Sequence, residues 1–180
     1  MEAHGTQERL QVHIRWLIRR DLPEVLAIEK ESFEFPWSEA EFADCLSRRN
    51  CVGMVAQHGQ RIVGYMIYEL GKTRIHLLNL AVAPSYRRRG VGSQMIAKLI
   101  SKLAPEQREK IFLEVRESNL VAQLFFRANG FRATSVLRNF YEDSPEDAYL
   151  MEYALSSAAP PAVITGVNRI ARYLNRTEGA

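Results

Sequence analysis

Apolar and polar positions alternate with two different periods along the chain, and together they predict a mixed α/β domain. Segments of strand length that are apolar throughout or at every second position lie at 11–18, 51–57, 61–70, 74–82, 110–115, 131–137 and 148–155. Segments with the spacing of an amphipathic helix lie at about 21–33, 38–47, 90–103 and 119–128. The predicted order is β-α-α-β-β-β-α-β-α-β-β, with one domain over residues 11–155.

Residues with known capping preferences mark the starts of the first two predicted helices. Asp21 precedes Pro23 and Glu24, which is a typical N-terminal capping pattern. Ser38 and Glu41 have the spacing of a capping box at the start of the second helix. The proline between these two helices predicts that residues 35–37 leave helical geometry.

The two ends of the chain differ in composition from this domain. Residues 1–10 are polar and predict a disordered leader, and residues 156–162 are rich in Ser, Ala and Pro and predict a linker. Residues 163–176 have apolar side chains on one helical face and arginines elsewhere, which predicts a C-terminal amphipathic helix. That helix either packs on the domain or contacts a ribosome, RNA or membrane surface.

Composition narrows the class of protein. The chain has 180 residues, of which 47% are hydrophobic, and a net charge of +3, which is compatible with an anionic ligand but does not indicate nucleic-acid binding. No apolar run approaches the roughly 18 residues that a membrane span needs, and the N-terminus lacks the apolar core of a signal peptide. Cys45 and Cys51 are expected to be reduced thiols in a cytoplasmic protein. The cysteines and histidines lack metal-ligand spacing, so we expect no metal, and no pattern indicates an oligomeric state.

The segment 87–92, between an apolar strand and a helix, is the strongest indication of a ligand. The first N–H groups of a helix have no partners within it and carry a partial positive charge. Gly90 and Gly92 let an anion approach the backbone, and three arginines add charge. These features describe either a pyrophosphate site or a basic turn that merely caps a helix, and the spacing alone does not separate the two.

Two other phosphate-binding motifs do not fit the chain. A dinucleotide-binding fingerprint needs a third glycine where this chain has Met95. The sequence Gly71-Lys72-Thr73 ends like a P-loop, but Met66 replaces the glycine required five residues earlier.

The apolar residues 80–84, followed by Arg-Arg-Arg-Gly-Val-Gly at 87–92, resemble the acetyl-CoA motif of the GNAT superfamily of N-acetyltransferases. Three more segments resemble the bacterial ribosomal-protein-alanine N-acetyltransferases within it. These are Phe-Pro-Trp-Ser at 35–38, Leu-Glu-Val-Arg-Glu-Ser-Asn at 113–119, and Arg-Asn-Phe-Tyr at 138–141 with Glu-Asp-Ala at 146–148. The resemblance covers roughly residues 12–155. It implies a mixed, mostly antiparallel sheet flanked by helices, with acetyl-CoA as cosubstrate.

The resemblance also implies how the cofactor is held. The strand 74–82 splays from the strand 110–115 and opens a slot, in which residues 80–82 offer backbone groups to the pantetheine arm and thioester. Residues 88–93 bind the pyrophosphate through backbone N–H groups, and Asn119 contacts the arm further along. The implied cofactor-binding residues are Leu80, Ala81, Val82, Arg87, Arg88, Arg89, Gly90, Val91, Gly92, Ser93, Asn119 and Phe126.

By the same resemblance, Glu114 is the base that removes a proton from the acceptor amine. An alkyl ammonium has no lone pair with which to attack a thioester, so a proton must leave first. The sequence alone also allows Glu114 to be a solvated carboxylate or an ion-pair partner of Arg116, although a charge within the apolar run 111–115 is unusual. A backbone N–H near residues 80–82 is expected to stabilise the oxyanion of the tetrahedral intermediate.

At one position the chain departs from the family. The family has a tyrosine four residues before its Gly-Phe pair, as the acid for the leaving thiolate, whereas Phe126 stands at that spacing before Gly130 and Phe131. Phenylalanine cannot donate a proton. The thiolate therefore leaves unprotonated or takes a proton from water, or Tyr141 substitutes as the acid, or the domain binds CoA with little catalysis.

The resemblance further implies that Phe35, Trp37 and Tyr141 shape the acceptor site, although core packing would also explain the first two. We expect an acetyl-CoA-dependent N-acetyltransferase whose acceptor is the N-terminal α-amine of a protein, with a ribosomal protein as one candidate. An α-amine, with a pKa near roughly 8, loses its proton more readily than a lysine amine, with a pKa near roughly 10.4. The alternatives are a small-amine or lysine acetyltransferase, a CoA-binding regulatory domain and a nucleic-acid binder.

Overall fold

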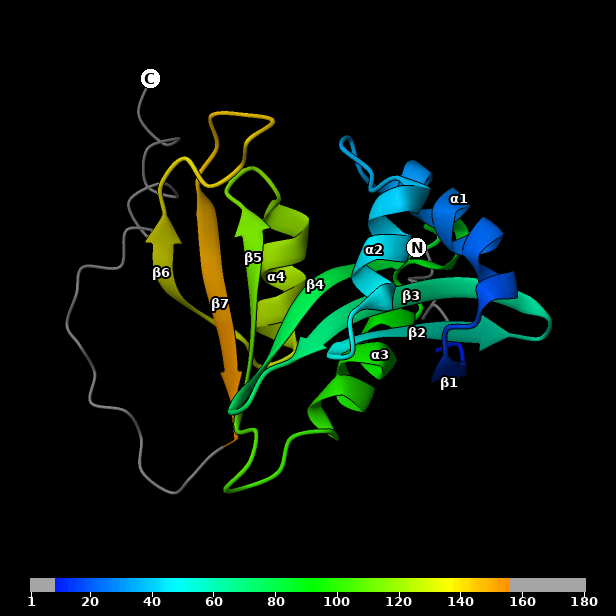
Figure 1. Cartoon of the computed structure of the whole chain (residues 1–180), viewed down its shortest axis with the longest axis horizontal. Coiled ribbons are helices and arrows are strands. Elements are labelled where there is room, and N and C mark those ends of the chain that lie inside the picture. The colour runs from blue at the N-terminus through cyan, green and yellow to red at the C-terminus, as the bar shows by residue number, and fades with distance from the viewer. Residues whose placement is uncertain (1–8, 156–180) are drawn as a thin grey trace, which may run out of the picture.

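Residues 9–155 are described by the structure, a computed structural model, and they form a seven-stranded sheet with helices on both faces (Figure 1). The strands are β1 (His13–Trp16), β2 (Cys51–His58), β3 (Arg61–Leu70), β4 (Arg74–Val82), β5 (Lys110–Arg116), β6 (Arg132–Leu137) and β7 (Ala148–Ala154). The helices are α1 (Leu22–Ser32), α2 (Glu39–Ser47), α3 (Val91–Ile100) and α4 (Leu120–Ala128). Apart from two short 3-10 turns, these elements follow one another in the predicted order.

The sheet has the strand order β1-β2-β3-β4-β5-β7-β6, and every neighbouring pair is antiparallel except β4 and β5. The predicted mixed, mostly antiparallel sheet is therefore confirmed. A two-residue turn joins β2 to β3, and Gly59 supplies the positive φ of 59° that such a turn requires.

The strands β4 and β5 pair only at their starts and then diverge, as Figure 1 shows. Residues 74–76 of β4 pair with residues 110–112 of β5. A β-bulge lies just beyond, because Tyr68 pairs with Leu77 and Ile67 pairs with Asn79, which leaves Leu78 without a partner in β3. A bulge bends its strand and sends the following side chains to the opposite face. Beyond the bulge, β4 continues beside β3 and leaves β5, so each of the diverging strands has an open edge.

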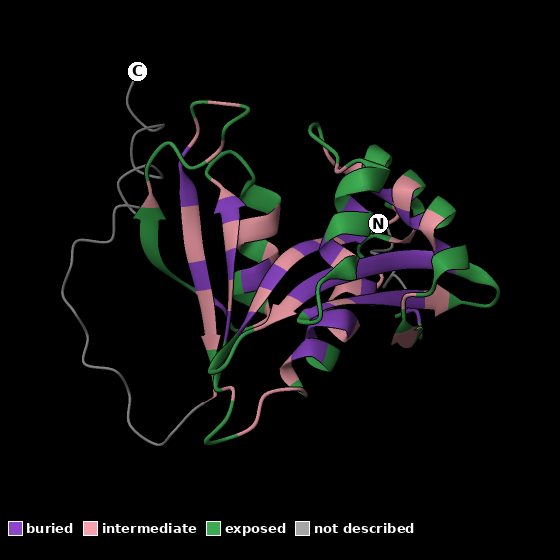
Figure 2. Ribbon diagram, in the orientation of Figure 1, coloured by how far each residue is buried: buried purple, intermediate pink, exposed green. Residues whose placement is uncertain are grey.

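Two apolar cores lie on opposite faces of the sheet, and Figure 2 shows the buried positions concentrated on its central strands. One core includes Met95 of α3 and Phe126 of α4, and the other includes Val25 of α1 and Phe42 of α2. Complete burial of one such large apolar side chain contributes about 1.5–3 kcal/mol relative to exposure. Packing on the sheet therefore holds all four helices in place, α3 and α4 in one core and α1 and α2 in the other.

The structure adjusts the predicted ends of several elements. The first strand is shorter than the predicted segment 11–18, and α3 ends at Ile100 rather than near residue 103. The capping box of α2 is confirmed: Glu41 N–H donates to Ser38 Oγ at 3.3 Å, and Ser38 N–H donates to Glu41 Oε2 at 2.7 Å.

Asp21 does not cap α1 through its side chain, so this part of the helix-start prediction is wrong. Its carboxylate instead accepts a hydrogen bond from Ile18 N–H at 2.9 Å and two from the Arg15 guanidinium of β1, at 2.7 and 2.8 Å. The Arg15 guanidinium holds the pKa of the Asp21 carboxyl below its usual value. Asp21 therefore ties the start of α1 to the edge strand.

Leu10 belongs to the folded domain, which corrects the prediction of a leader over residues 1–10. Its side chain is buried, its N–H donates to Arg89 O at 2.9 Å, and its C=O accepts from Gln94 Nε2 at 2.6 Å. The chain therefore enters the domain beside the loop that precedes α3. Residues 1–8 of that leader, the predicted linker 156–162 and the predicted helix 163–176 lie outside the described residues. Within residues 9–155, no helix combines the length and apolar content needed to cross a membrane.

Candidate active site

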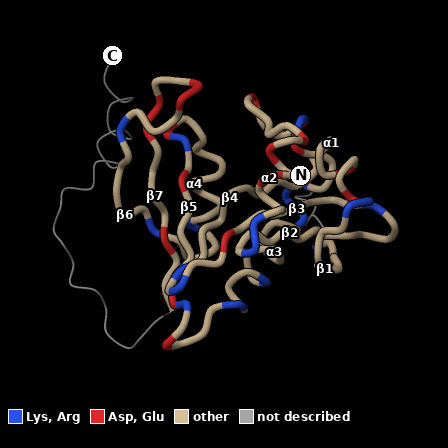
Figure 3. Tube along the Cα trace, in the orientation of Figure 1, with Lys and Arg blue, Asp and Glu red and all other residues tan. Residues whose placement is uncertain are grey.

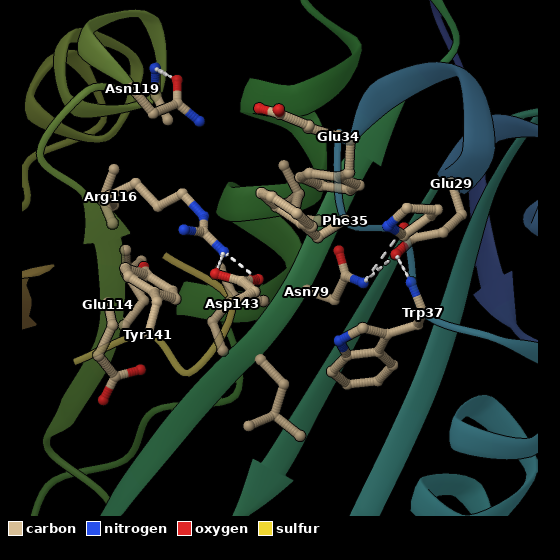
Figure 4. Close-up of a pocket in the computed structure, with 18 of the residues that line it drawn as sticks. Glu29, Glu34, Phe35, Trp37, Asn79, Glu114, Arg116, Asn119, Tyr141 and Asp143 are labelled. Atoms are coloured by element: carbon tan, nitrogen blue, oxygen red, sulfur yellow. Dashed lines mark hydrogen bonds and ion pairs between the residues drawn. The ribbon is translucent and has the colours of Figure 1, made fainter. Parts of the chain in front are cut away.

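The divergence of β4 and β5 opens a cleft of about 710 Å³ (Figure 4). Its walls come from β4, β5, α4, the α1–α2 loop and the β6–β7 loop. Seven of the residues proposed from the sequence line it: Phe35, Trp37, Leu80, Glu114, Asn119, Phe126 and Tyr141. The fold therefore brings residues with predicted catalytic, cofactor and acceptor roles to one cleft.

On the β4 wall, backbone groups face the open edge. Ala83 N–H donates to Val63 O in β3 at 2.9 Å. Because the backbone groups of successive strand residues point to alternate sides, those of Ala81 also point toward β3, whereas those of Leu80 and Val82 point toward the open edge. The expectation that all of residues 80–82 offer backbone groups to a ligand is therefore corrected: Ala81 uses its groups within the sheet.

The loop before α3 presents a series of free backbone donors. None of the N–H groups of residues 88–93 donates a hydrogen bond to a group within residues 9–155. Arg88 and Gly90 have positive φ angles of 62° and 79°, and α3 begins at Val91, so a left-handed turn leads directly into the first helical turn. A Cβ on Gly92 would lie 3.0 Å from Phe125 Cζ of α4, which explains a glycine at that position. Free amides of this kind at a helix N-terminus have the geometry that an anion site needs.

The three arginines of this loop have different surroundings. Arg87 donates from Nε to Val82 O and from Nη2 to Ser32 Oγ, each at 2.9 Å, so it joins β4 to α1. The guanidinium carbon of Arg89 lies 5.9 Å from the centroid of the Tyr86 ring. Arg88 is exposed, and its side chain has no partner within the described residues. Of the three, Arg87 is held by hydrogen bonds, whereas the guanidinium groups of Arg88 and Arg89 form no hydrogen bond or ion pair within the described residues.

Glu114 lies next to the point where β4 and β5 separate. Its Oε2 is 2.6 Å from His76 Nε2, and the His76 ring stacks on Phe112 with 4.2 Å between ring centroids. The side chains of Glu114 and His76 are 17% and 25% exposed, so both remain in reach of solvent. The alternative in which Glu114 pairs with Arg116 is excluded by this arrangement. The sequence analysis missed His76 as a site residue, because only the pairing of β4 with β5 brings it to Glu114.

Arg116 joins the far end of β5 to both loops at the mouth of the cleft. Its Nη2 lies 2.6 Å from Asp143 Oδ2, and its Nη1 lies 2.8 Å from Glu146 Oε2. Its guanidinium carbon lies 3.7 Å from the ring centroid of Tyr141 and 5.1 Å from that of Phe35. The hydrogen-bonded guanidinium holds the pKa of the Asp143 carboxyl below its usual value. All of these partners lie far from Arg116 in the sequence. The sequence alone therefore did not indicate that Arg116 joins the two loops.

Tyr141 and Phe126 decide whether a side-chain hydroxyl in the cleft could donate a proton to a leaving group. Tyr141 is the one tyrosine among the described residues that line the cleft, and burial raises the pKa of its phenol to about 12. Phe126 is 7% exposed and packs edge-on against Phe125 and Phe131, with centroid distances of 5.1 and 5.4 Å. Phe126 therefore contributes an apolar wall without a hydroxyl group.

A buried carboxylate that the sequence analysis missed lies behind the α1–α2 loop. Glu29 is 1% exposed and accepts hydrogen bonds from Trp37 N–H and Asn79 Nδ2, as Figure 4 shows. It also accepts one from the Tyr65 hydroxyl. The sequence contained one signal that Glu29 is buried: it lies four residues after Val25, on the apolar face of α1.

Charge is distributed unevenly around the cleft. Figure 3 shows acidic residues on the β6–β7 loop and near the α1–α2 loop. The acidic residues that line the cleft are Glu29, Glu34, Glu41, Glu114 and Asp143, against one basic residue, Arg116. Within residues 9–155, no group of His, Cys, Asp and Glu side chains is arranged to hold a metal ion.

A mixed sheet that opens between two parallel neighbours, beside a helix N-terminus with free amides, is the arrangement that the resemblance to the GNAT superfamily implied. Residues 20–131 match the family model of the acetyltransferase (GNAT) family. The chain belongs to this family and is an N-acetyltransferase.

Individual relatives agree with this assignment. The chain is 33% identical over 138 residues to the [ribosomal protein bS18]-alanine N-acetyltransferase of Escherichia coli K12. The aligned region covers 76% of this chain and 93% of that protein. The crystal structure of the ribosomal-protein-S18-alanine N-acetyltransferase from Escherichia coli has a TM-score of 0.73 at 30% identity, over 84% of this chain and 98% of that chain. The crystal structure of Arabidopsis thaliana NAA60 in complex with acetyl-CoA has a TM-score of 0.70 at 18% identity, over 81% and 99% of the two chains, which is a likeness of fold.

Proposed function

We propose that this N-acetyltransferase uses acetyl-CoA to acetylate the N-terminal α-amine of a protein, with a ribosomal protein as the first candidate. The observation that carries the proposal is the cleft between β4 and β5, which combines free backbone groups on β4, the Glu114–His76 pair and an acidic lining. The name of the Escherichia coli relative, which specifies an alanine of a ribosomal protein, supports the choice of acceptor. A ribosomal protein as acceptor agrees with the expected cytoplasmic location.

Backbone groups would hold most of the acetyl-CoA. The free N–H groups of residues 88–93 would bind the pyrophosphate, and Arg88 would add charge. The open-edge C=O of Leu80 and N–H of Val82 would pair with the pantetheine amides as an added strand does. Asn119 Oδ1 caps α4 by accepting from Ala122 N–H at 3.0 Å, which leaves Asn119 Nδ2 free among the described residues to contact the arm. The complex of NAA60 with acetyl-CoA supports this cosubstrate for the fold.

Glu114 would take the first proton from the acceptor ammonium, directly or through a water molecule, while His76 keeps the carboxylate in position. The neutral amine then attacks the thioester carbonyl and forms a tetrahedral oxyanion, which Leu80 N–H would stabilise. Collapse of this intermediate breaks the C–S bond. The products are the N-acetylated amine and CoA thiolate, and the remaining proton on nitrogen passes to the thiolate or to water.

Tyr141 is a poor acid for the leaving thiolate. Burial raises the pKa of its phenol to about 12, well above the roughly 8.5 of a thiol, so proton transfer from Tyr141 to the thiolate is unfavourable. We therefore favour departure of the thiolate without a tyrosine. Tyr141, stacked on Arg116, would instead form the wall of the acceptor site together with Phe35 and Trp37.

Two physical features favour an α-amine over a lysine. At pH 7 about a tenth of an α-amine with a pKa near 8 is neutral, against less than about a thousandth of a lysine amine with a pKa near 10.4. The acidic lining of the cleft attracts a cationic acceptor, and a free N-terminus is the cationic group that Glu114 can deprotonate at the lowest cost.

A CoA-binding domain without catalysis is the second candidate, and the missing hydroxyl at Phe126 is the observation that favours it. Release of free thiol from acetyl-CoA decides between the two candidates. The acceptors to compare are a peptide with a free N-terminal alanine, the same peptide with a blocked N-terminus and one lysine, and a polyamine. We expect release with the first peptide, at a rate well above that of the others. Tight CoA binding without release for any amine would refute the proposal, and faster release with lysine or polyamine would reassign the acceptor.

A further inference from the structure

We infer that Glu29 is a positioning residue of the acceptor site: its buried carboxylate holds Trp37, and with it the α1–α2 loop, against the cleft. The inference rests on the proposed function, because it assigns a residue to the acceptor side of the same cleft. Glu29, Trp37 and Asn79 all line that cleft.

The carboxylate of Glu29 is saturated with neutral donors. Its Oε1 accepts from Trp37 N–H at 2.7 Å and from Asn79 Nδ2 at 3.3 Å, and its Oε2 accepts from Asn79 Nδ2 at 3.2 Å and from the Tyr65 hydroxyl. No cation within residues 9–155 forms an ion pair with Glu29. A buried carboxylate without a cation depends on its hydrogen bonds for stabilisation, so each donor must keep its position.

An aromatic contact closes the same cluster from the other side. The rings of Trp37 and Phe42 meet edge-on with 5.4 Å between centroids, and those of Phe42 and Tyr65 with 5.7 Å. Phe42 and Tyr65 are both 0% exposed. Since the Tyr65 hydroxyl returns to Glu29, the backbone and the ring of Trp37 are both fixed by one closed set of contacts.

The loop between α1 and α2 has little else to hold it. The bond from Trp37 N–H to Glu29 is the one hydrogen bond that the backbone of residues 34–37 forms within the described part of the chain. Phe35 is 46% exposed and touches Arg116 through its ring. Without the carboxylate of Glu29, this wall of the cleft would lose its backbone anchor, while the loop 88–93 and the edge of β4 would keep their structure.

Trp37 also serves as a probe that does not depend on catalysis. The chain has two tryptophans, and the other, Trp16, is 58% exposed on the edge strand β1. In a Trp16→Phe background, quenching of Trp37 fluorescence by acrylamide therefore reports on the loop. The variant to test is Glu29→Gln, which keeps the size of the side chain but replaces one accepting oxygen with an amide group. Glu31→Gln, an exposed position of the same helix, is the matched control.

For Glu29→Gln we expect stronger quenching of Trp37 and a rise in KM for the alanine peptide of about tenfold, with kcat and the Kd for CoA within about twofold. Glu31→Gln should change none of these. Unchanged quenching and unchanged acceptor KM would overturn the inference, and so would stronger quenching with an unchanged KM or an equal loss of CoA affinity.

Two further outcomes are covered by the same design. If Glu29→Gln does not fold, Tyr65→Phe removes a single donor from the cluster and is judged by the same quenching and KM criteria. If the parent protein acetylates no peptide, the proposed function fails and the acceptor role of Glu29 falls with it. The quenching comparison then still decides whether Glu29 anchors the loop.

Discussion

His76 Nε2 and Glu114 Oε2 lie 2.6 Å apart, although the two residues are 38 positions apart and belong to different strands. They meet because His76 is the last residue of β4 that pairs with β5, and Glu114 follows its partner Phe112 by two positions, on the same face. The pair therefore sits at the point where the sheet opens. A carboxylate held by an imidazole at this point is well placed to accept a proton inside the cleft.

Replacing Glu114 tests its role as base. We expect Glu114→Gln to lower kcat at neutral pH by about 10²–10³-fold, in the range of general-base catalysis, with the Kd for CoA unchanged. Glu39→Gln, an exposed position on α2, is the charge-matched control. Steady-state thiol release and calorimetric CoA binding provide the two measurements. Unchanged turnover would remove Glu114 as the base.

Replacing His76 tests whether it positions the carboxylate. His76→Leu removes the donor beside Glu114 and should lower kcat/KM by about tenfold. His76→Gln, which can still donate to Glu114, should recover part of this loss. Equal losses in the two variants would show that the ring, through its stacking on Phe112, matters more than its hydrogen bond. Comparing kcat/KM for both variants with one alanine peptide checks this prediction.

Replacing Phe126 tests the missing acid. Phe126→Tyr adds a hydroxyl to a ring that lines the cleft, so thiol release should be equal to or faster than that of the parent protein. The midpoint of thermal unfolding should be measured in parallel, because Phe126 also packs against Phe125 and Phe131. A large loss of turnover with an unchanged midpoint would mean that the site is built around phenylalanine.

The backbone of the loop before α3 should matter more for CoA than its arginine side chains. Gly90→Ala puts a Cβ at a φ of 79° and 3.1 Å from Arg9 Cγ, so the free N–H groups must shift. We expect it to weaken CoA binding by at least about tenfold. Arg88→Ala removes one exposed charge and should weaken binding by less than about fivefold. Calorimetric titration measures the Kd for CoA of both variants. A larger loss of affinity in Arg88→Ala than in Gly90→Ala would mean that the Arg88 side chain contributes more to CoA binding than the backbone does.

The Arg15–Asp21 pair should make stability depend on pH in the acid range. Because the native pKa of Asp21 is lowered, its contribution is present above the usual carboxyl pKa, near 4, and is lost as the pH falls below that value toward the native pKa. Asp21→Asn should reduce the free energy of unfolding at pH 7 by about 1–3 kcal/mol, since it removes a charged and nearly buried hydrogen-bond acceptor. Denaturant unfolding at pH 7 and pH 3 measures this difference, which should narrow at pH 3. A constant difference between the two pH values would contradict the assignment.

Local sequence determined most of the secondary structure and the character of the loop before α3. Apolar periodicity and caps act within a few residues, so the order of the strands and helices and the Ser38–Glu41 box could be read from neighbouring positions. The segment 87–92 was recognisable for the same reason, since a helix start, two glycines and a basic turn adjoin in the chain. Where a local reading failed, as for Asp21, a residue of another element supplied the partner: Arg15 on the edge strand, six positions earlier.

Only the tertiary structure decided how the cleft is built and which residues act together in it. The bulge at Leu78 changes the face of every following residue of β4, and no pattern of apolar residues specifies which position of a strand is left unpaired. The pairing of His76 with Glu114 depends on the register of β4 and β5, and the bond of Glu29 to Asn79 depends on how α1 packs on the sheet. The sequence by itself therefore determined the order of the strands and helices and indicated a candidate base, Glu114. Strand register and helix packing, which join residues far apart in the chain, decided what Glu114 and the α1–α2 loop contact.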